Sequence, residues 1–160
     1  MPVKKLKAFL NQHHIKYVSI IHSPAYTAQE IAASAHIPGQ ELAKTVILNV
    51  DGKNVMAVLP ASYQVDFQRL RKALGAHQVE LTSERQFEKL FPDCEVGAMP
   101  PFGNLYDLEV YVAERLTEDD EIVFNAGTHS ELIRLAYADF AKLVKPRVLR
   151  FSTTEAAMPW

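Results

Sequence analysis

The stretch ELAKTVILNVDGKNVMAVLPAS, residues 41–62, contains two apolar runs that are joined by Asp51 and Gly52. Both of these residues tolerate the positive φ angles of a type I′ turn, so the sequence predicts a β-hairpin with a fixed register. Side chains alternate between the two faces of a strand, which places Lys44 on the more apolar face and Thr45 on the other. Lys44 therefore either extends along apolar surface with its ammonium in water, or lines a pocket that holds a carbonyl, carboxylate or phosphate.

Composition limits the chain to one compact domain. Its 160 residues are 48% hydrophobic and 22% charged, which suffices for one buried core. The 17 basic and 19 acidic residues nearly balance, so we expect no broad positive surface for nonspecific nucleic-acid binding, although a few local contacts with a ligand stay open. Cys94 is the only cysteine, which excludes an internal disulfide and fits a reducing cytoplasm. No apolar stretch reaches the roughly 20 residues of a membrane helix, so we expect a soluble cytoplasmic protein.

Helical and strand patterns alternate along the rest of the chain. Asp66 and Ser83 are predicted helix N-caps, Gly75 ends the first of these two helices, and Thr27 with Glu30 has the spacing of a capping box. Helices are expected at 3–12, 27–35, 67–74, 84–91 and 137–144, and strands outside the hairpin at 17–21, 77–81, 108–112, 121–125 and 130–136.

The order of these elements predicts an α+β fold. The hairpin and the short connections between later strands argue against an all-parallel sheet, so we expect a mixed, mainly antiparallel one. Residues 1–151 would form the single domain. Residues 152–160 show no periodicity and are expected to be a loosely ordered tail, unless Trp160 anchors it.

The segment VGAMPPFGN, residues 96–104, is the first candidate for a site. Pro100 and Pro101 fix two backbone angles, while Gly97 and Gly103 permit unusual ones. The segment is either a plain structural loop or a preformed loop that presents backbone groups to a ligand.

The segment NAGTHSE, residues 125–131, is the second candidate. It ends a predicted strand with polar groups around His129, which is either an exposed loop histidine or a pocket residue. His22 is either a turn residue or part of a pocket mouth. No pair of histidines has zinc-ligand spacing, and no Walker loop, dinucleotide fingerprint or nucleophile elbow is present, so neither a metal nor a cofactor is predicted.

The segments ELAKTVIL, VGAMPPFG with its Gly97-x-x-x-Pro101 pattern, and NAGTHSELIRLAYADF occur in this order along the chain. Together they resemble the YbaK/ProX-type family of aminoacyl-tRNA editing domains, which looks related to the editing domain inserted in bacterial prolyl-tRNA synthetases. The likeness runs from HSPAYTAQEIA to RLAYADFAKLVKP. It implies a curved mixed sheet surrounded by helices. It also implies hydrolysis of the ester that joins a wrong amino acid to the 3′ end of a tRNA.

The resemblance also implies roles for individual residues. Lys44 matches the family's essential lysine, and His129 matches a pocket histidine that follows a glycine-threonine pair. Thr45 stands where the family can carry an asparagine. The implied catalytic residues are Lys44, Gly97 and Pro101, and the implied substrate-binding residues are His22, Thr45, Ala98, Met99, Pro100, Gly127, Thr128 and His129.

In the implied mechanism, the Lys44 ammonium contacts the substrate carbonyl or the terminal ribose-phosphate region and favours negative charge there. Backbone groups of the 97–101 loop would hold the α-amino group and terminal adenosine for attack by water or by the substrate's own side chain. His129 would bound the amino-acid pocket. Relatives act on small aminoacyl groups such as alanine, cysteine or serine. The expected partner is the tRNA 3′ end, and recruitment by a synthetase is a further option.

Two other functions stay open from the sequence. One is a noncatalytic module that binds aminoacyl-tRNA ends, nucleotides or a synthetase, with Lys44 as an anion contact, because a fold does not by itself fix a function. The other is a hydrolase of small esters or acyl-adenylates. A measurement of turnover distinguishes the noncatalytic module from an editing enzyme. A requirement for tRNA distinguishes an editing enzyme from a hydrolase of small esters or acyl-adenylates.

Overall fold

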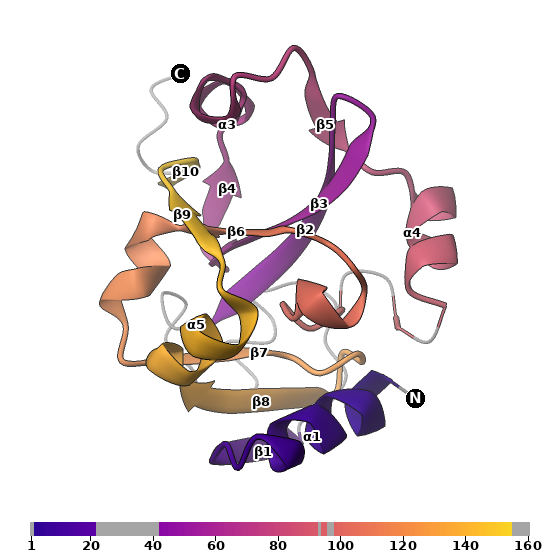
Figure 1. Cartoon of the computed structure of the whole chain (residues 1–160), viewed down its shortest axis with the longest axis vertical. Coiled ribbons are helices and arrows are strands. Elements are labelled where there is room, and N and C mark those ends of the chain that lie inside the picture. The colour runs from indigo at the N-terminus through magenta and orange to yellow at the C-terminus, as the bar shows by residue number, and fades with distance from the viewer. Residues whose placement is uncertain (1, 22–41, 93, 96–97, 155–160) are drawn as a thin grey trace.

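The computed structural model describes residues 2–21, 42–92, 94–95 and 98–154 (Figure 1). Helices and strands are interspersed along this part of the chain. Its α-helices are α1 Pro2–Gln12, α3 Phe67–Leu74, α4 Glu84–Leu90 and α5 Tyr137–Val144, and its 3-10 turns are η1 Gly103–Leu105 and η2 Glu114–Glu118. Its strands are β1 Tyr17–Ile21, β2 Ala43–Val50, β3 Lys53–Pro60, β4 Tyr63–Val65, β5 Val79–Leu81, β6 Val110–Ala113, β7 Glu121–Asn125, β8 Glu131–Ala136, β9 Arg147–Leu149 and β10 Ser152–Thr154.

The strands form a mixed arrangement in which antiparallel pairs predominate. A five-stranded sheet has the order β5-β2-β3-β6-β9, with β6 parallel to both of its neighbours. An antiparallel sheet has the order β1-β8-β7, and β10 pairs with β4. In Figure 1 the β2–β3 hairpin crosses the molecule diagonally, and its lower end meets the sheet of β7, β8 and β1. The predicted α+β fold with a mixed, mainly antiparallel sheet is confirmed.

The turn of the central hairpin has the predicted chemistry. Asp51 and Gly52 have φ angles of 49° and 91°, as a type I′ turn requires. The Asp51 carboxylate also accepts hydrogen bonds from the backbone N–H groups of His77 (3.0 Å) and Gln78 (2.8 Å), which precede β5. These bonds, that from His77 first, lower the pKa of Asp51. One turn residue thus fixes the hairpin and ties the next strand of the sheet to it.

The helix termini follow the sequence signals. Asp66 caps α3 by accepting a hydrogen bond from the N–H of Arg69 at 3.1 Å, and Gly75 ends that helix with a φ of 63°. Ser83 caps α4 by accepting from the N–H of Gln86 at 3.3 Å. Side-chain oxygens at these positions satisfy N–H groups that have no partner within the helix.

Apolar side chains cover both faces of the hairpin and make two clusters. The main core lies on the face of Ile47 and Met56, and the second cluster lies on the face of Leu48 and Val55. The main core also contains Leu6, Leu10, Val58, Phe87, Phe91, Met99, Phe102, Ile122, Phe124, Ile133, Leu135 and Phe140. Because β2 and β3 contribute to both clusters, the clusters belong to one domain.

Three short strands were not predicted: β4, β9 and β10. The expectation of a loose tail from residue 152 is wrong for Ser152–Thr154, which pair with Tyr63–Val65. Residues 155–160 and the predicted helix at 27–35 lie outside the described residues. Within the described ranges, no helix is long and apolar enough to cross a membrane.

Candidate active site

Lys44 is the second residue of β2 and is half-buried. It lies opposite Leu59 on β3, whereas Thr45 lies opposite Val58. Leu59 belongs to the second cluster and Val58 to the main core. Directly opposite residues of a strand pair share a face, so the side chains of Lys44 and Thr45 project in opposite directions. Thr45, which is 8% exposed, is therefore placed on the core side of β2 and away from Lys44.

The start of β2 lies beside β7. Leu42 and Val123 form a parallel bridge, the link between the five-stranded sheet and the three-stranded one. Ile122 and Phe124 belong to the main core, so Val123 and Asn125 project from the other face of β7. Asn125 is 9% exposed, and its Oδ1 has no hydrogen-bond partner among the described residues. The amide oxygen of Asn125 is thus buried on the face of β7 that points away from the main core.

The candidate loop at 98–103 is buried and is anchored by one aromatic side chain. Phe102 is fully buried, and its ring centroid lies 5.6 Å from that of Phe124 and 5.5 Å from that of Phe140. The side chain of Met99 also packs in the main core. The side chains of Met99 and Phe102 therefore attach this loop to the main core.

Gly103 is needed for space. A Cβ at this position would lie 2.5 Å from the backbone oxygen of Leu108 and 2.6 Å from a methyl group of Val110. The Gly103 carbonyl accepts hydrogen bonds from the N–H groups of Tyr106 and Leu108, both at 2.9 Å. The φ of Gly103 is not positive, so close packing, and not an unusual backbone angle, accounts for the glycine.

The two candidate loops are joined directly by hydrogen bonds. The N–H of Gly127 donates to the carbonyl of Ala98 at 2.8 Å, and the N–H of Glu95 donates to the carbonyl of Gly127 at 2.9 Å. The Glu95 carboxylate accepts from the N–H of His129 at 2.6 Å. Gly127 has a φ of 103°, a conformation that favours glycine. Backbone geometry therefore brings together two segments that are far apart in the sequence.

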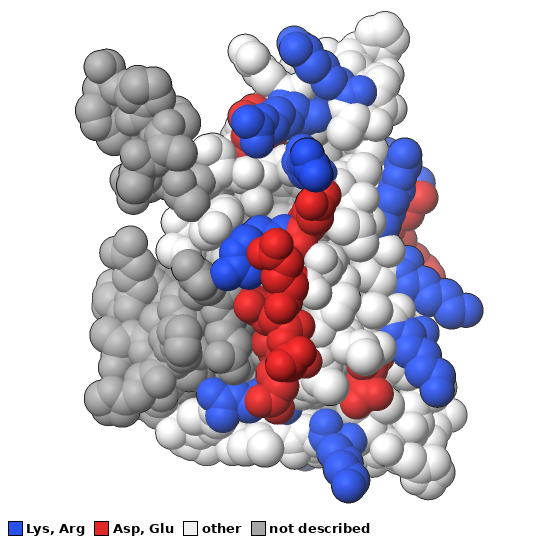
Figure 2. Space-filling model, turned by 90° about the vertical axis from the view of Figure 1, so that its left-hand side faces the viewer, with Lys and Arg blue, Asp and Glu red and all other residues white. Residues whose placement is uncertain are grey.

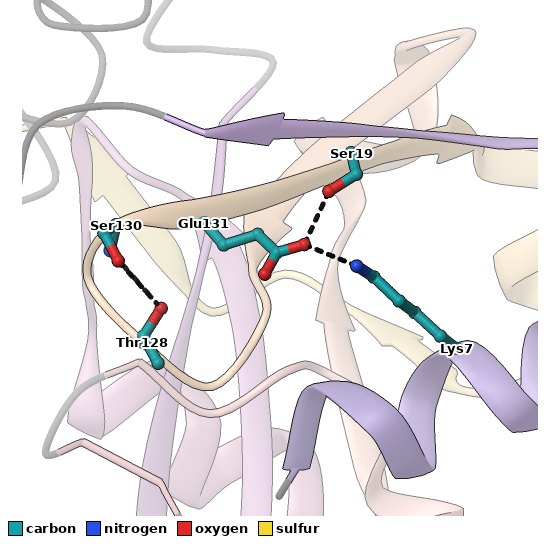
Figure 3. Close-up of polar contacts among 5 residues, drawn as sticks. All are labelled: Lys7, Ser19, Thr128, Ser130 and Glu131. Atoms are coloured by element: carbon teal, nitrogen blue, oxygen red, sulfur yellow. Dashed lines mark hydrogen bonds and ion pairs between the residues drawn. The ribbon is translucent and has the colours of Figure 1, made fainter.

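The far end of the second loop is fixed to α1 and β1 (Figure 3). The N–H of Ala126 donates to the carbonyl of Glu131, which closes the loop at 3.0 Å. The Glu131 carboxylate accepts from Ser19 Oγ at 2.5 Å and pairs with Lys7 Nζ at 2.8 Å. Burial acts to raise the pKa of Glu131, but the bonds from Lys7 and Ser19 outweigh it and lower this pKa. Within the loop, the hydroxyls of Thr128 and Ser130 lie 3.3 Å apart.

The sequence-predicted site residues do not all lie in one place. Ala98, Pro100 and Pro101 are buried in the first loop, and Gly127, half-buried Thr128 and buried His129 form the second loop beside it. Lys44 lies on the strand that bridges to β7, whereas the side chains of Thr45 and Met99 lie on the core side. Gly97 and His22 lie outside the described residues.

Sequence reasoning missed two residues at this place. Glu95 precedes the glycine-proline pattern and carries no motif of its own, so only the fold shows that it reaches His129. Asn125 is a polar residue that closes an apolar strand, and this is the signal that the sequence offers for it. Among the described residues, no group of three His, Cys, Asp or Glu side chains could hold a metal ion.

The arrangement combines a half-buried cation, a buried amide and two loops with fixed backbone groups. A lysine ammonium stabilises negative charge that develops on a substrate, and preformed N–H and C=O groups orient polar ligands without reorganisation. Groups of these kinds can bind a polar ligand and stabilise negative charge on it.

Comparisons with known proteins identify the family of the chain. The family model of the aminoacyl-tRNA editing domain matches residues 22–143. The multifunctional Ser/Thr-tRNA deacylase ProXp-y of Escherichia coli (strain K12) is 27% identical over 156 residues, which cover 94% of this chain and 93% of that protein. A proline–tRNA ligase of Bacillus cytotoxicus is 32% identical over 82 residues, covering 51% of this chain and 14% of that enzyme.

A solved structure shows the same fold. It is described as a putative trans-editing enzyme for prolyl tRNA synthetase, and it superimposes with a TM-score of 0.80 at 18% identity. The superposition covers 95% of this chain and 97% of that one. With the family model matching most of the chain, the protein belongs to the aminoacyl-tRNA editing domain family and is a hydrolase of the aminoacyl-tRNA ester bond.

Proposed function

We propose that this protein is a trans-editing deacylase, which removes a small, wrongly attached amino acid from a tRNA that a synthetase has already released. The hydrogen bond between Gly127 and Ala98, beside the strand of Lys44, is the observation that carries the proposal. It joins the two loops whose residues were expected to hold the substrate. The span of the matches supports action in trans, since the chain aligns with nearly the whole E. coli deacylase but with a small part of a proline–tRNA ligase.

In the proposed reaction, water attacks the ester carbonyl, the bond to the terminal ribose breaks, and the ribose oxygen leaves with a proton. The Lys44 ammonium lies near the carbonyl or the terminal ribose-phosphate and stabilises the negative charge of the transition state. Backbone groups of the 97–101 segment hold the α-amino group and the terminal adenosine. Gly127, Thr128 and His129 bound the amino-acid pocket.

The proposed substrates carry alanine, cysteine or serine. Editing by a second site is needed for such small side chains, because one methylene changes binding by only about 1–3 kcal/mol. The similarity to a Ser/Thr-tRNA deacylase favours serine within this set. Recruitment by an aminoacyl-tRNA synthetase is part of the proposal, because a related domain is found within proline–tRNA ligases.

A deacylation panel tests the proposal. Purified protein is incubated with tRNAs charged with alanine, cysteine, serine, threonine or proline, and the release of each amino acid is followed. Lys44→Ala is compared with Lys53→Ala, which removes an exposed lysine from the neighbouring strand. We expect hydrolysis of one or two small aminoacyl groups, lost in Lys44→Ala and kept in Lys53→Ala. Full activity in a folded Lys44→Ala protein would refute the role of Lys44, and binding without turnover would favour a noncatalytic module.

A further inference from the structure

We infer that Glu95 is a positioning residue, which fixes the position of His129 relative to the candidate loop at 98–103. The inference rests on the proposed function, because it concerns the pocket that His129 bounds. Glu95 makes three hydrogen bonds to other residues in the described part of the chain: its N–H donates to Gly127, its carbonyl accepts from Ala98 at 3.0 Å, and its carboxylate accepts from His129 at 2.6 Å. One residue thus contacts both loops.

The bond to His129 differs in kind from the other two. It joins a carboxylate to a backbone N–H, and such charge-assisted bonds are shorter and stronger than those between neutral groups. His129 is 6% exposed, so its N–H has little access to water as a substitute acceptor. Loss of the carboxylate would leave this N–H to find another partner, and the backbone of residues 128–130 would move to do so.

The position of Glu95 makes this a local effect. The residue itself is exposed and belongs to neither apolar cluster, so removing its side chain opens no cavity in the core. The backbone bond of Gly127 to Ala98 and that of Ala126 to Glu131 do not involve the Glu95 side chain. Both ends of the second loop therefore stay attached when the carboxylate is removed, and only the segment around His129 is released.

A change in the placement of His129 alters the width of the proposed pocket. Pocket width decides which aminoacyl side chain fits, and small displacements at a reacting centre lower rates strongly. The carboxylate of Glu95 should therefore affect both the rate of hydrolysis and the preference between serine and alanine. A residue that only stabilises the fold would lower both rates equally through the folded fraction.

Three variants test the inference: Glu95→Ala, Glu95→Gln and the control Glu88→Ala, which removes an exposed carboxylate from α4. Glu95→Gln keeps an oxygen that can accept from His129. We expect kcat/KM to fall at least about tenfold in Glu95→Ala, with a changed ratio between seryl- and alanyl-tRNA. Glu95→Gln should keep most of the activity and the ratio, and Glu88→Ala should equal the wild type. An unchanged rate and ratio in Glu95→Ala would overturn the inference while leaving the proposed function standing.

Nuclear magnetic resonance of the His129 backbone amide gives a readout that does not depend on activity. In the wild type, this amide proton should resonate downfield and exchange slowly with solvent. In Glu95→Ala it should move upfield and exchange faster, while the amides of Ala126 and Gly127 stay protected. If the wild type hydrolyses none of the charged tRNAs, the proposed function fails. The amide signal then tests the inference by itself, and an unchanged chemical shift and exchange rate of the His129 amide in Glu95→Ala would overturn it.

Discussion

Gly127 donates its backbone N–H to the carbonyl of Ala98 at 2.8 Å and does so with a φ of 103°. Side chains with a Cβ are disfavoured in this conformation by about 1–2 kcal/mol. We therefore expect Gly127→Ala to lose about that much stability and to lower deacylation more than stability alone explains. Thermal unfolding and kcat/KM, measured on the same preparations, check this. Gly75→Ala is the control. It introduces the same kind of backbone strain at a left-handed residue that ends α3, where no atom lies within 4 Å of the added Cβ and which is not part of the candidate active site. Equal loss of activity in the two variants would contradict the prediction.

The ion pair of Glu131 predicts a pH-dependent stability. Its folded-state pKa is lowered, despite burial, by the bonds from Lys7 and Ser19. The stabilisation is therefore complete above the unfolded-state pKa and is lost as the pH falls through the folded-state pKa. At about pH 7, Glu131→Gln should cost about 1–2 kcal/mol, and the gap from wild type should close as the solution is acidified.

Urea unfolding at a series of pH values measures this gap. Glu121→Gln, at an exposed position on the neighbouring strand β7, is the control and should stay close to wild type throughout. A gap for Glu131→Gln that stays constant from neutral to acid pH would show that the charge of Glu131 does not contribute.

Phe102 predicts a coupling between core packing and activity. It is fully buried and follows Pro101 directly, with ring contacts to Phe124 and Phe140. Phe102→Ala should lower the free energy of unfolding by about 3–5 kcal/mol. Phe102→Leu should lower it clearly less, because the leucine side chain leaves a smaller cavity. Denaturant unfolding measures both costs. At a temperature where both variants are folded, activity should fall in the same order, since the ring holds the loop in place. An activity equal to wild type in folded Phe102→Ala would mean that the loop does not need this anchor.

Acidic side chains form a band down the face shown in Figure 2. The turn η2 and the start of β7, which lie on that side of Figure 1, carry Glu114 and the run Glu118 to Glu121. Because like charges repel, tRNA phosphates should approach another face. Replacing Glu118, Asp120 and Glu121 by their amides should lower KM for aminoacyl-tRNA about two- to fivefold at low salt, leave kcat unchanged, and lose this effect at high salt. Steady-state kinetics at two salt concentrations decide this, and a raised KM would place the band at the RNA interface.

Local signals in the sequence predicted much of the fold. The turn at Asp51, the caps at Asp66 and Ser83, and the strand β8 all depend on neighbouring residues, and each is confirmed. The strand β10 was missed because three residues carry too little pattern, and its stability comes from pairing with β4. The parallel pairing of β6 with β3 and β9 is likewise set by partners distant in sequence.

The sequence predicted the separate segments of the candidate site but not the contacts between them. The two loops were recognised by composition, but their hydrogen bonds to each other depend on where β7 and the 98–103 segment lie in the fold. Glu95 illustrates the limit, since an exposed glutamate has no local feature that indicates a bond to His129. The catalytic and substrate-binding roles of the predicted residues stay predictions until the variants above are measured.

The bridge between Leu42 and Val123 has a consequence for when activity appears during synthesis. It pairs a residue just before β2 with one in β7, so this contact cannot form before Val123 has left the ribosome. The loop of His129 also needs β8, which comes still later. A nascent chain that is still within the ribosome at β8 therefore has the lysine strand but no site. Deacylase activity would then appear only after the chain through β8 has emerged and folded.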